Sequence, residues 1–419
     1  MNALFERLQQ TRGACALLES TTTGGPLARR SLLARHPRAV LVADARGTRV
    51  ETAASTRTLA GDPLDHVGAL LRELPPGAWP EEGAVVGALA YDYARPRDAD
   101  PSALRLVAIA VDRLEILEND AASGTPTAGI AARAPVVLDL ARHSNLTRAE
   151  YRQKVQRLQQ HIAAGDIYQA NLSQRFQVPW PADGLSLYSR LRTTSPAPFA
   201  GYLRAGGIEI VSASPERLLL VDGNRMRTRP IAGTRPRAAD PARDSALAAE
   251  LLLSEKERAE HLMLVDLARN DLGRVAQIGS VAVDELMVVE AYSHVRHIVS
   301  NVSARLAEGA APLDALRALF PGGTITGVPK IRCMDILDAI EGVPRGFYTG
   351  SLFYLTPSGR LDANILIRSA VVAGGIATFH TGGGIVADSD PELEYEETLH
   401  KAEGLRVALE AGLTYNGAP

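Results

Sequence analysis

The sequence predicts an α+β fold, in which antiparallel hairpins are mixed with long helices. Three observations favour this class over a wound parallel sheet. Short strand-like runs follow one another after brief turns, as at Asp222-Gly223-Asn224. Gly374-Gly375 separates two further runs and is a strong signal for a two-residue hairpin. Long helical stretches occur beside these hairpins instead of alternating with every strand.

Residues 1–140 form an N-terminal region that is rich in Ala, Arg, Pro and Gly. Strands are expected at 39–43 and 85–91. The stretch 121–135 is small, polar and contains Pro and Gly, so it predicts a loop or linker. We treat the two regions, 1–140 and 145–419, as parts of one intertwined unit.

The second region, 145–419, begins with a helix signal. Thr147 and Glu150 fit a capping box, apolar residues follow at helical spacing, and Gly165 suits the helix end. A second capping box, Ser254 with Glu257, predicts a long helix over 254–271. Asp390-Pro391 predicts the start of the last helix. Strands are expected at 167–178, 208–212, 217–221, 226–229, 365–372 and 376–380.

The composition excludes several classes of protein. The chain has 419 residues, 46% hydrophobic and 22% charged, with a net charge of -3, so it lacks the basic surplus of a nucleic-acid-binding protein. Two cysteines exclude a disulfide framework. We find neither a signal peptide nor a run long enough to cross a membrane, and we expect a soluble cytoplasmic protein. Only four basic residues are lysines, which marks them as candidates for specific roles: Lys154, Lys256, Lys330 and Lys401.

Two pairs of glutamates with i,i+3 spacing each share one helix face. The pairs are Glu257 with Glu260 and Glu394 with Glu397, and Lys401 follows one turn after the second pair. Carboxylates gathered in this way suit a hard cation such as Mg2+, which prefers oxygen ligands. The alternative is two solvated acidic faces that pair with nearby Arg or Lys side chains.

Three loops could bind or process an anion. Thr381-Gly382-Gly383-Gly384 follows a predicted strand, and its backbone amides could form an anion-binding nest. Glu216, in a turn between two strands, is a candidate acid or base. In the loop 230–237, Gly233 permits a close backbone approach. Each could equally be an ordinary turn. His297 alone indicates neither a metal site nor a catalytic triad, and there is no Rossmann or P-loop motif.

Several segments in order resemble the chorismate-utilising enzymes, a family that includes anthranilate synthase component I, aminodeoxychorismate synthase component I and the isochorismate and salicylate synthases. The resemblance covers about residues 145 to 410, and Leu17-Leu18-Glu19-Ser20 extends it more loosely into the N-terminal region. The segments are Gly165–Ser173, Ser214–Arg217, Pro230–Thr234, Ala259–Asp271, Phe320–Gly327 and Gly382–Ser389.

The resemblance implies a large antiparallel sandwich of two sheets flanked by helices, and a set of site residues. It assigns Mg2+ to Glu260 and Glu397, with Glu257 and Glu394 in support. It assigns the enolpyruvyl carboxylate of chorismate to Arg368, Tyr348 and the amides of Gly382, Gly383 and Gly384. The remaining assigned residues are Glu216 as acid or base, His297 beside the departing hydroxyl, Thr234 and Thr324 as pocket lining, and Lys401 near the metal-bound carboxylate.

Two positions bear on the product. Family members that add water have a lysine where this chain has Gln169, so the resemblance implies ammonia as nucleophile, supplied by a separate glutamine amidotransferase subunit. The residues found in most of the shared motifs favour 4-amino-4-deoxychorismate, a precursor of p-aminobenzoate and folate, as the product. Ala232 departs from that group, which usually has a nucleophilic lysine there, and fits anthranilate synthase instead. Anthranilate is therefore the alternative product.

Two further alternatives concern regulation. Glu19 and Ser20 match the family's tryptophan-pocket segment, although a plain strand edge explains them equally well. A chorismate- or tryptophan-binding regulator without activity is the alternative from another class of protein. The complete set of candidate site residues favours the enzyme.

Overall fold

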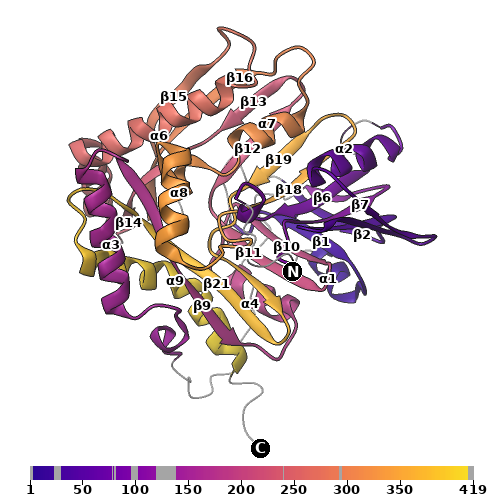
Figure 1. Ribbon diagram of the computed structural model, residues 1–419, viewed down its shortest axis with the longest axis horizontal. Coiled ribbons are helices and arrows are strands. Elements are labelled where there is room, and N and C mark those ends of the chain that lie inside the picture. Colours follow the sequence, from indigo (N-terminus) through magenta and orange to yellow (C-terminus); the bar gives the residue numbers. More distant parts are fainter. Residues whose placement is uncertain are drawn as a thin grey trace, which may run out of the picture.

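The computed structural model describes residues 3–22, 30–77, 79, 82–95, 102–118, 138–238, 240–291 and 295–413. It confirms the α+β class: two antiparallel sheets pack face to face and helices lie against them (Figure 1). The apolar layer between the sheets includes Leu203 and Ile210 from one sheet and Val86 and Leu352 from the other. The predicted linker 121–135 lies outside the described residues.

The first sheet has the strand order β17-β9-β21-β20-β11-β10-β1-β2-β8. Its strands are β1 (Cys15–Glu19), β2 (Arg30–Arg35), β8 (Glu115–Glu118), β9 (Gln169–Pro179), β10 (Phe199–Ala205), β11 (Ile208–Ser214), β17 (Gly327–Val328), β20 (Ser369–Ala373) and β21 (Ile376–Ile385).

The second sheet has the order β14-β16-β13-β12-β19-β18-β6-β7-β3-β4-β5, and β15 also pairs with β16. Its strands are β3 (Ala39–Asp44), β4 (Gly47–Thr52), β5 (Thr56–Leu59), β6 (Ala84–Leu89), β7 (Leu106–Val111), β12 (Arg217–Asp222), β13 (Arg225–Thr228), β14 (Ile231–Pro236), β15 (Ala282–Ala291), β16 (Val295–Arg305), β18 (Ser351–Leu355) and β19 (Leu361–Asn364). Each sheet combines strands from both regions of the chain: β1 pairs with β10, and β6 with β18 (Figure 1).

Helices α4 and α9 pack on the first sheet, and α6 and α7 pack on the second. The helices are α1 (Ala3–Gln10), α2 (Pro63–Glu73), α3 (Arg148–Ala163), α4 (Gly184–Thr194), α5 (Pro241–Leu253), α6 (Glu255–Gly273), α7 (Pro312–Leu319), α8 (Lys330–Glu341) and α9 (Pro391–Leu413), with short 3-10 turns η1 (Tyr91–Tyr93), η2 (Leu140–His143) and η3 (Gly323–Ile325). Within the described ranges, none of these helices has the length and apolarity that a membrane crossing requires.

Most of the predicted local signals are present. The Thr147 and Glu150 capping box forms completely, and Gly374 and Gly375 both have positive φ in the β20–β21 turn. The second capping box forms only in part. Ser254 accepts the Glu257 backbone N–H, but the Glu257 side chain accepts a hydrogen bond from Arg235 at 3.1 Å.

The predicted strand 365–372 is wrong in its first half, because β20 begins only at Ser369. β19 belongs to the second sheet and β20 to the first, so residues 365–368 carry the chain from one sheet to the other. Their apolar sequence predicts a strand, but the crossing requires a bend. Arg368 accordingly has a φ of 51°, a left-handed conformation that is unusual for a residue with a side chain.

Candidate active site

Three segments of the chain meet where it crosses between the sheets. The turn from β11 to β12 contains Glu216, and its carbonyl oxygen accepts the backbone N–H of Ile365 at 3.0 Å. The carbonyl oxygen of Leu366, in the segment 365–368 that also crosses between the sheets, accepts the backbone N–H of Thr349 at 2.8 Å. Glu216, Tyr348 and Arg368 are therefore fixed relative to one another by backbone hydrogen bonds, although they are far apart in sequence.

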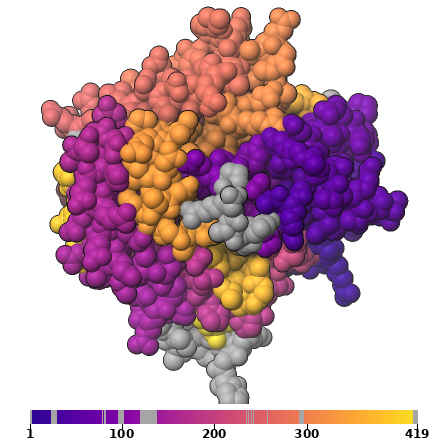
Figure 2. All heavy atoms as spheres, in the orientation of Figure 1, coloured from indigo at the N-terminus to yellow at the C-terminus, as the bar shows by residue number. Residues whose placement is uncertain are grey.

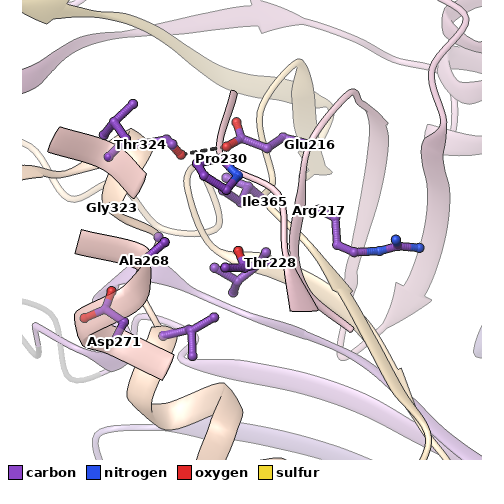
Figure 3. A pocket seen from close by; sticks show the side chains of 13 residues that line it. Glu216, Arg217, Thr228, Pro230, Ala268, Asp271, Gly323, Thr324 and Ile365 are labelled. Atoms are coloured by element: carbon purple, nitrogen blue, oxygen red, sulfur yellow. Dashed lines mark hydrogen bonds between the residues drawn. The ribbon is translucent and has the colours of Figure 1, made fainter. Parts of the chain in front are cut away.

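Glu216 is a buried carboxyl group, only 6% exposed. Burial raises its pKa from 4.5 to about 7, against the opposing effects of Thr324 and Lys401. The Thr324 hydroxyl donates a hydrogen bond to Glu216 Oε1 at 2.8 Å, and both residues line one cavity (Figure 3). A carboxyl group with this pKa can donate or accept a proton near neutral pH.

Tyr348 forms a second part of the site. Its ring stacks on His380, with 5.1 Å between the centroids, and burial raises its pKa to about 12. Its hydroxyl lies 2.9 Å from the point that a Cβ on Gly382 would occupy. The Tyr348 hydroxyl is therefore neutral at pH 7 and lies beside the backbone of Gly382, which has no side chain.

Arg368 is an arginine without a counterion among the described residues. No carboxylate in the described part of the chain forms an ion pair with it, and burial lowers the pKa of its guanidinium group. Its backbone carbonyl accepts the N–H of Ala213 at 3.1 Å, which holds the residue at the sheet crossing. A partly buried guanidinium that pairs with no described carboxylate is suited to bind a carboxylate of a ligand.

The glycine run does not form the predicted loop nest. Gly382, Gly383 and Gly384 belong to β21 and pair with β9, because the ladder between these strands continues to Ile385. Side chains would collide here for three separate reasons. A Cβ on Gly382 would meet Tyr348, one on Gly383 would lie 3.0 Å from Glu394 Oε2, and one on Gly384 would lie 2.5 Å from Gln169 Nε2. The three glycines therefore leave β21 without side chains at the place where Tyr348, Glu394 and Gln169 approach it.

Gln169 begins β9 and is almost buried, at 9% exposed. Its Nε2 faces Gly384, and its Oε1 accepts no hydrogen bond from the described residues. A buried amide oxygen without a partner is uncommon and indicates that a ligand or water group completes its hydrogen bonding.

The acidic residues of α9 face the same strand. Glu394 and Glu397 both approach the Cβ position of Gly383, at 3.0 and 3.8 Å. Lys401 pairs with Glu397 at 2.7 Å and donates to the carbonyl of Gly382 at 3.0 Å. Both glutamates therefore lie close to bare backbone of the candidate site.

The acidic residues of α6 lie against β14. Glu257 pairs with Arg235 at 3.1 Å, and Glu260, three residues later, is half-buried. In the described part of the chain, no three His, Cys, Asp or Glu side chains gather as a metal cluster. The donors still fit Mg2+ in kind, because this ion commonly takes one or two carboxylates and completes its shell with water and substrate oxygens.

His297 lies on β16 opposite a bulge in β14 at Ala232 and Thr234. Its Nδ1 lies 3.2 Å from the carbonyl oxygen of Gly233, so Nδ1 donates the hydrogen bond. Burial lowers the pKa of His297. The ring is therefore neutral at pH 7, with Nε2 as the nitrogen that can accept a proton. Gly233 has a φ of 65°, which this bulge requires.

Glu19 lies elsewhere, in a buried ion pair. Its carboxylate accepts two hydrogen bonds from Arg192, at 2.9 and 2.8 Å, and one from Tyr188 at 2.7 Å. Ser20 shares a hydrogen bond with Thr22. These contacts give Glu19 a structural role, and the tryptophan pocket at this segment stays a prediction.

Sequence reasoning missed Arg345, which holds several parts of the site together. It forms a buried pair with Glu341 at 2.7 Å and donates to the carbonyls of Asn171 and Ile325. Its guanidinium also lies over the ring of Tyr348. The i,i+4 spacing of Glu341 and Arg345 could have signalled the pair, but the sequence does not show its burial.

Three comparisons agree with this architecture. A model of the chorismate binding enzyme family matches residues 14–406. Anthranilate synthase component 1 from Streptomyces coelicolor is 50% identical over 267 residues, 64% of this chain and 52% of that protein. Its namesake from Acetivibrio thermocellus is 36% identical over 456 aligned positions, 97% of this chain and 92% of that protein.

A solved structure is also similar. Anthranilate synthase component I from Streptococcus pneumoniae TIGR4 superposes with a TM-score of 0.77 at 30% identity, over 91% of this chain and 93% of that one. This confirms the predicted fold type. The matched segment spans about half the length of the Streptomyces coelicolor protein. The family match, by contrast, covers most of this chain, and the chain belongs to the chorismate binding enzyme family.

Proposed function

We propose that the chain is a chorismate-utilising synthase that adds ammonia at C2 of chorismate and forms anthranilate, with the C4 hydroxyl lost as water and the enolpyruvyl group lost as pyruvate. The observation that carries this proposal is Glu216, a buried acid with a pKa of about 7 that hydrogen-bonds to Thr324 in a cavity. Loss of a hydroxyl group from chorismate needs a proton donor at neutral pH, and Glu216 has the pKa for that task.

The candidate site contains a cation and hydrogen-bond donors that suit a carboxylate of chorismate. The proposal assigns the enolpyruvyl carboxylate to Arg368, the hydroxyl of Tyr348 and backbone amides of the glycine run. His297 is assigned to the departing hydroxyl and Thr234 to the pocket wall. The unpaired state of Arg368 and the bare backbone beside Tyr348 support this placement.

Mg2+ is proposed as the cofactor, with Glu260 and Glu397 as ligands and Glu257 and Glu394 in support. When bound, the ion would neutralise the ring carboxylate of chorismate and stabilise charge shifts in the ring. Lys401 already contacts Glu397, so it would lie next to that carboxylate.

Ammonia is proposed as the nucleophile because Gln169 cannot deprotonate water. Its amide oxygen, which has no partner among the described residues, could accept a hydrogen bond from ammonia. A separate glutamine amidotransferase subunit would supply the ammonia, as the resemblance implies.

The position of the new amine depends on Ala232. An alanine offers no nucleophile for a covalent intermediate at C2. The similar proteins from Streptomyces coelicolor and Acetivibrio thermocellus are both anthranilate synthase components. Both observations favour anthranilate. Aminodeoxychorismate synthesis is the second candidate, because the residues of most shared motifs favour it.

Product analysis tests the proposal. The full chain is incubated with chorismate, ammonium and Mg2+, and anthranilate is detected by its fluorescence. A second aliquot receives aminodeoxychorismate lyase, which would convert any 4-amino-4-deoxychorismate to p-aminobenzoate. Anthranilate without p-aminobenzoate is expected, and the reverse would establish the second candidate. Unchanged chorismate in both aliquots would favour a non-catalytic regulator.

A further inference from the structure

A second cavity lies over the inner face of the first sheet. Residues of β11, β20 and β21 line it, and Ile208 and Ile210 of β11 alternate as side chains on one face of a sheet do. Ile208, Ile210 and Val371 provide an apolar floor, and Phe347 adds an aromatic wall. The empty volume is about 910 Å3, including the part open to solvent, which is enough for a small organic molecule.

Two polar groups without partners line this apolar cavity. Arg175 forms no ion pair with any described residue, and its buried Nε donates no hydrogen bond. His380 is 3% exposed, and its Nδ1 has no hydrogen-bond partner within the described ranges either. Buried polar groups in this state are rare, and two in one cavity indicate that a ligand satisfies them.

Neither of the other charged residues that line the cavity is a described ion-pair partner of Arg175. Arg345 is itself a cation and is paired with Glu341. Asp92 accepts the backbone N–H of Gly346 at 3.0 Å. Partial burial lowers the pKa of Arg175, and no described carboxylate acts in the opposite direction. Partial burial of a cation without a counterion costs some free energy, which a bound anion would offset.

We propose that this cavity binds a small organic carboxylate, with its apolar or aromatic body on Ile208, Ile210 and Phe347 and its carboxylate group on Arg175. The neutral His380 contributes a further hydrogen bond. This ligand is distinct from the substrate at the candidate active site. The two sites share one wall, because Tyr348 has its hydroxyl beside Gly382 and its ring stacked on His380.

Calorimetric titration with phenylacetate tests this site on the full chain. Because phenylacetate could also occupy the proposed substrate site, Arg368→Leu serves as the matched control for Arg175→Leu. We expect Arg368→Leu to bind phenylacetate as the wild type does. We expect Arg175→Leu to weaken binding at least about tenfold, since it removes a charge-assisted hydrogen bond.

Val371→Phe provides an independent test, because it fills the cavity and leaves Arg175 intact. It should also abolish binding, with circular dichroism as the check on folding. 2-Phenylethanol, which lacks the carboxylate, should bind at least about tenfold more weakly than phenylacetate. Binding lost in Arg368→Leu and retained in Arg175→Leu would overturn the proposal. So would the absence of phenylacetate binding to the wild type.

Discussion

The two sides of the candidate site differ in how they are built. The sheet-crossing side is held by backbone hydrogen bonds, with Glu216 and Tyr348 buried and Arg368 partly buried. The acidic side is open: the side chains of Glu397 and Lys401 are 50% and 42% exposed, and they pair with each other.

The two sides therefore differ in whether their groups must move before a ligand binds. Groups on the crossing side need no rearrangement, because their positions follow from the fold. Carboxylates on the acidic side are held by cationic side chains, which must yield before a metal ion can use the same oxygens. Changes on the crossing side should therefore alter chemistry and stability strongly, whereas changes on the acidic side should mainly alter the response to metal.

The largest expected effect is on catalysis by Glu216. Glu216→Gln keeps the shape and can still accept the hydrogen bond from Thr324, but it cannot transfer a proton. We expect kcat to fall by about 100- to 10,000-fold, the usual contribution of a general acid or base. Chorismate binding, measured by calorimetry, should change little. A variant with near-normal kcat would remove Glu216 from the chemistry.

The next largest effect is on stability. Arg345→Met leaves Glu341 buried without its partner, and we expect the free energy of unfolding to fall by about 3–5 kcal/mol. Arg269→Met is the matched control, because the Arg269–Asp266 pair is exposed and should contribute less than about 1 kcal/mol. Urea denaturation measures both. Equal losses would show that Arg345 does not hold the crossing side together.

The pKa of Glu216 also predicts a dependence of stability on pH. An unfolded glutamate ionises near pH 4.5, whereas folded Glu216 keeps its proton up to about pH 7. Its contribution to stability is therefore intact below pH 4.5 and is lost as the pH rises to about 7, by about 3 kcal/mol. Glu216→Gln should be more stable than the wild type at pH 8 and should lose this advantage at pH 4. Parallel stability profiles would contradict this expectation.

Local patterns predicted much of this molecule, since a capping box or a two-residue turn depends on neighbouring residues. The Thr147 box and the Gly374-Gly375 turn are confirmed for that reason. The failures involve contacts between distant segments. An apolar run at 365–368 bends because it changes sheet, and Gly382–Gly384 stay extended because β9 pairs with them.

The candidate site shows the same limit. The family resemblance named Glu216 and Arg368, but nothing local indicates that Glu216 is buried or that Arg368 has no described carboxylate partner. Arg345 was missed because two of its partners, Asn171 and Ile325, come from distant segments of the chain, and the local spacing of Glu341 does not show burial. Scarcity singled out the lysines as candidates for specific roles, and this stays a prediction: Lys401 pairs with Glu397, and Lys330 forms a buried pair with Asp271.

Arg368 should control substrate affinity more than turnover. Arg368→Gln would remove the proposed charge-assisted pair with the enolpyruvyl carboxylate, so we expect KM for chorismate to rise by about 10- to 100-fold. The variant should reach a kcat within a few-fold of the wild type at saturating chorismate. Steady-state kinetics separates the two constants. A fall in kcat with KM unchanged would place Arg368 in the chemical step instead of in binding.

The smallest effect is expected on the acidic side, from Arg235. Its pairing with Glu257 competes with the proposed use of that carboxylate by Mg2+. Because such partly exposed pairs contribute at most about 1 kcal/mol, Arg235→Gln should lower the Mg2+ concentration for half-maximal activity by no more than about fivefold. Arg269 belongs to α6, as Glu257 does, but lies near the other end of that helix. Arg269→Gln should therefore leave the Mg2+ requirement unchanged. A higher Mg2+ requirement in Arg235→Gln would mean that Arg235 positions Glu257 for the metal instead of competing with it.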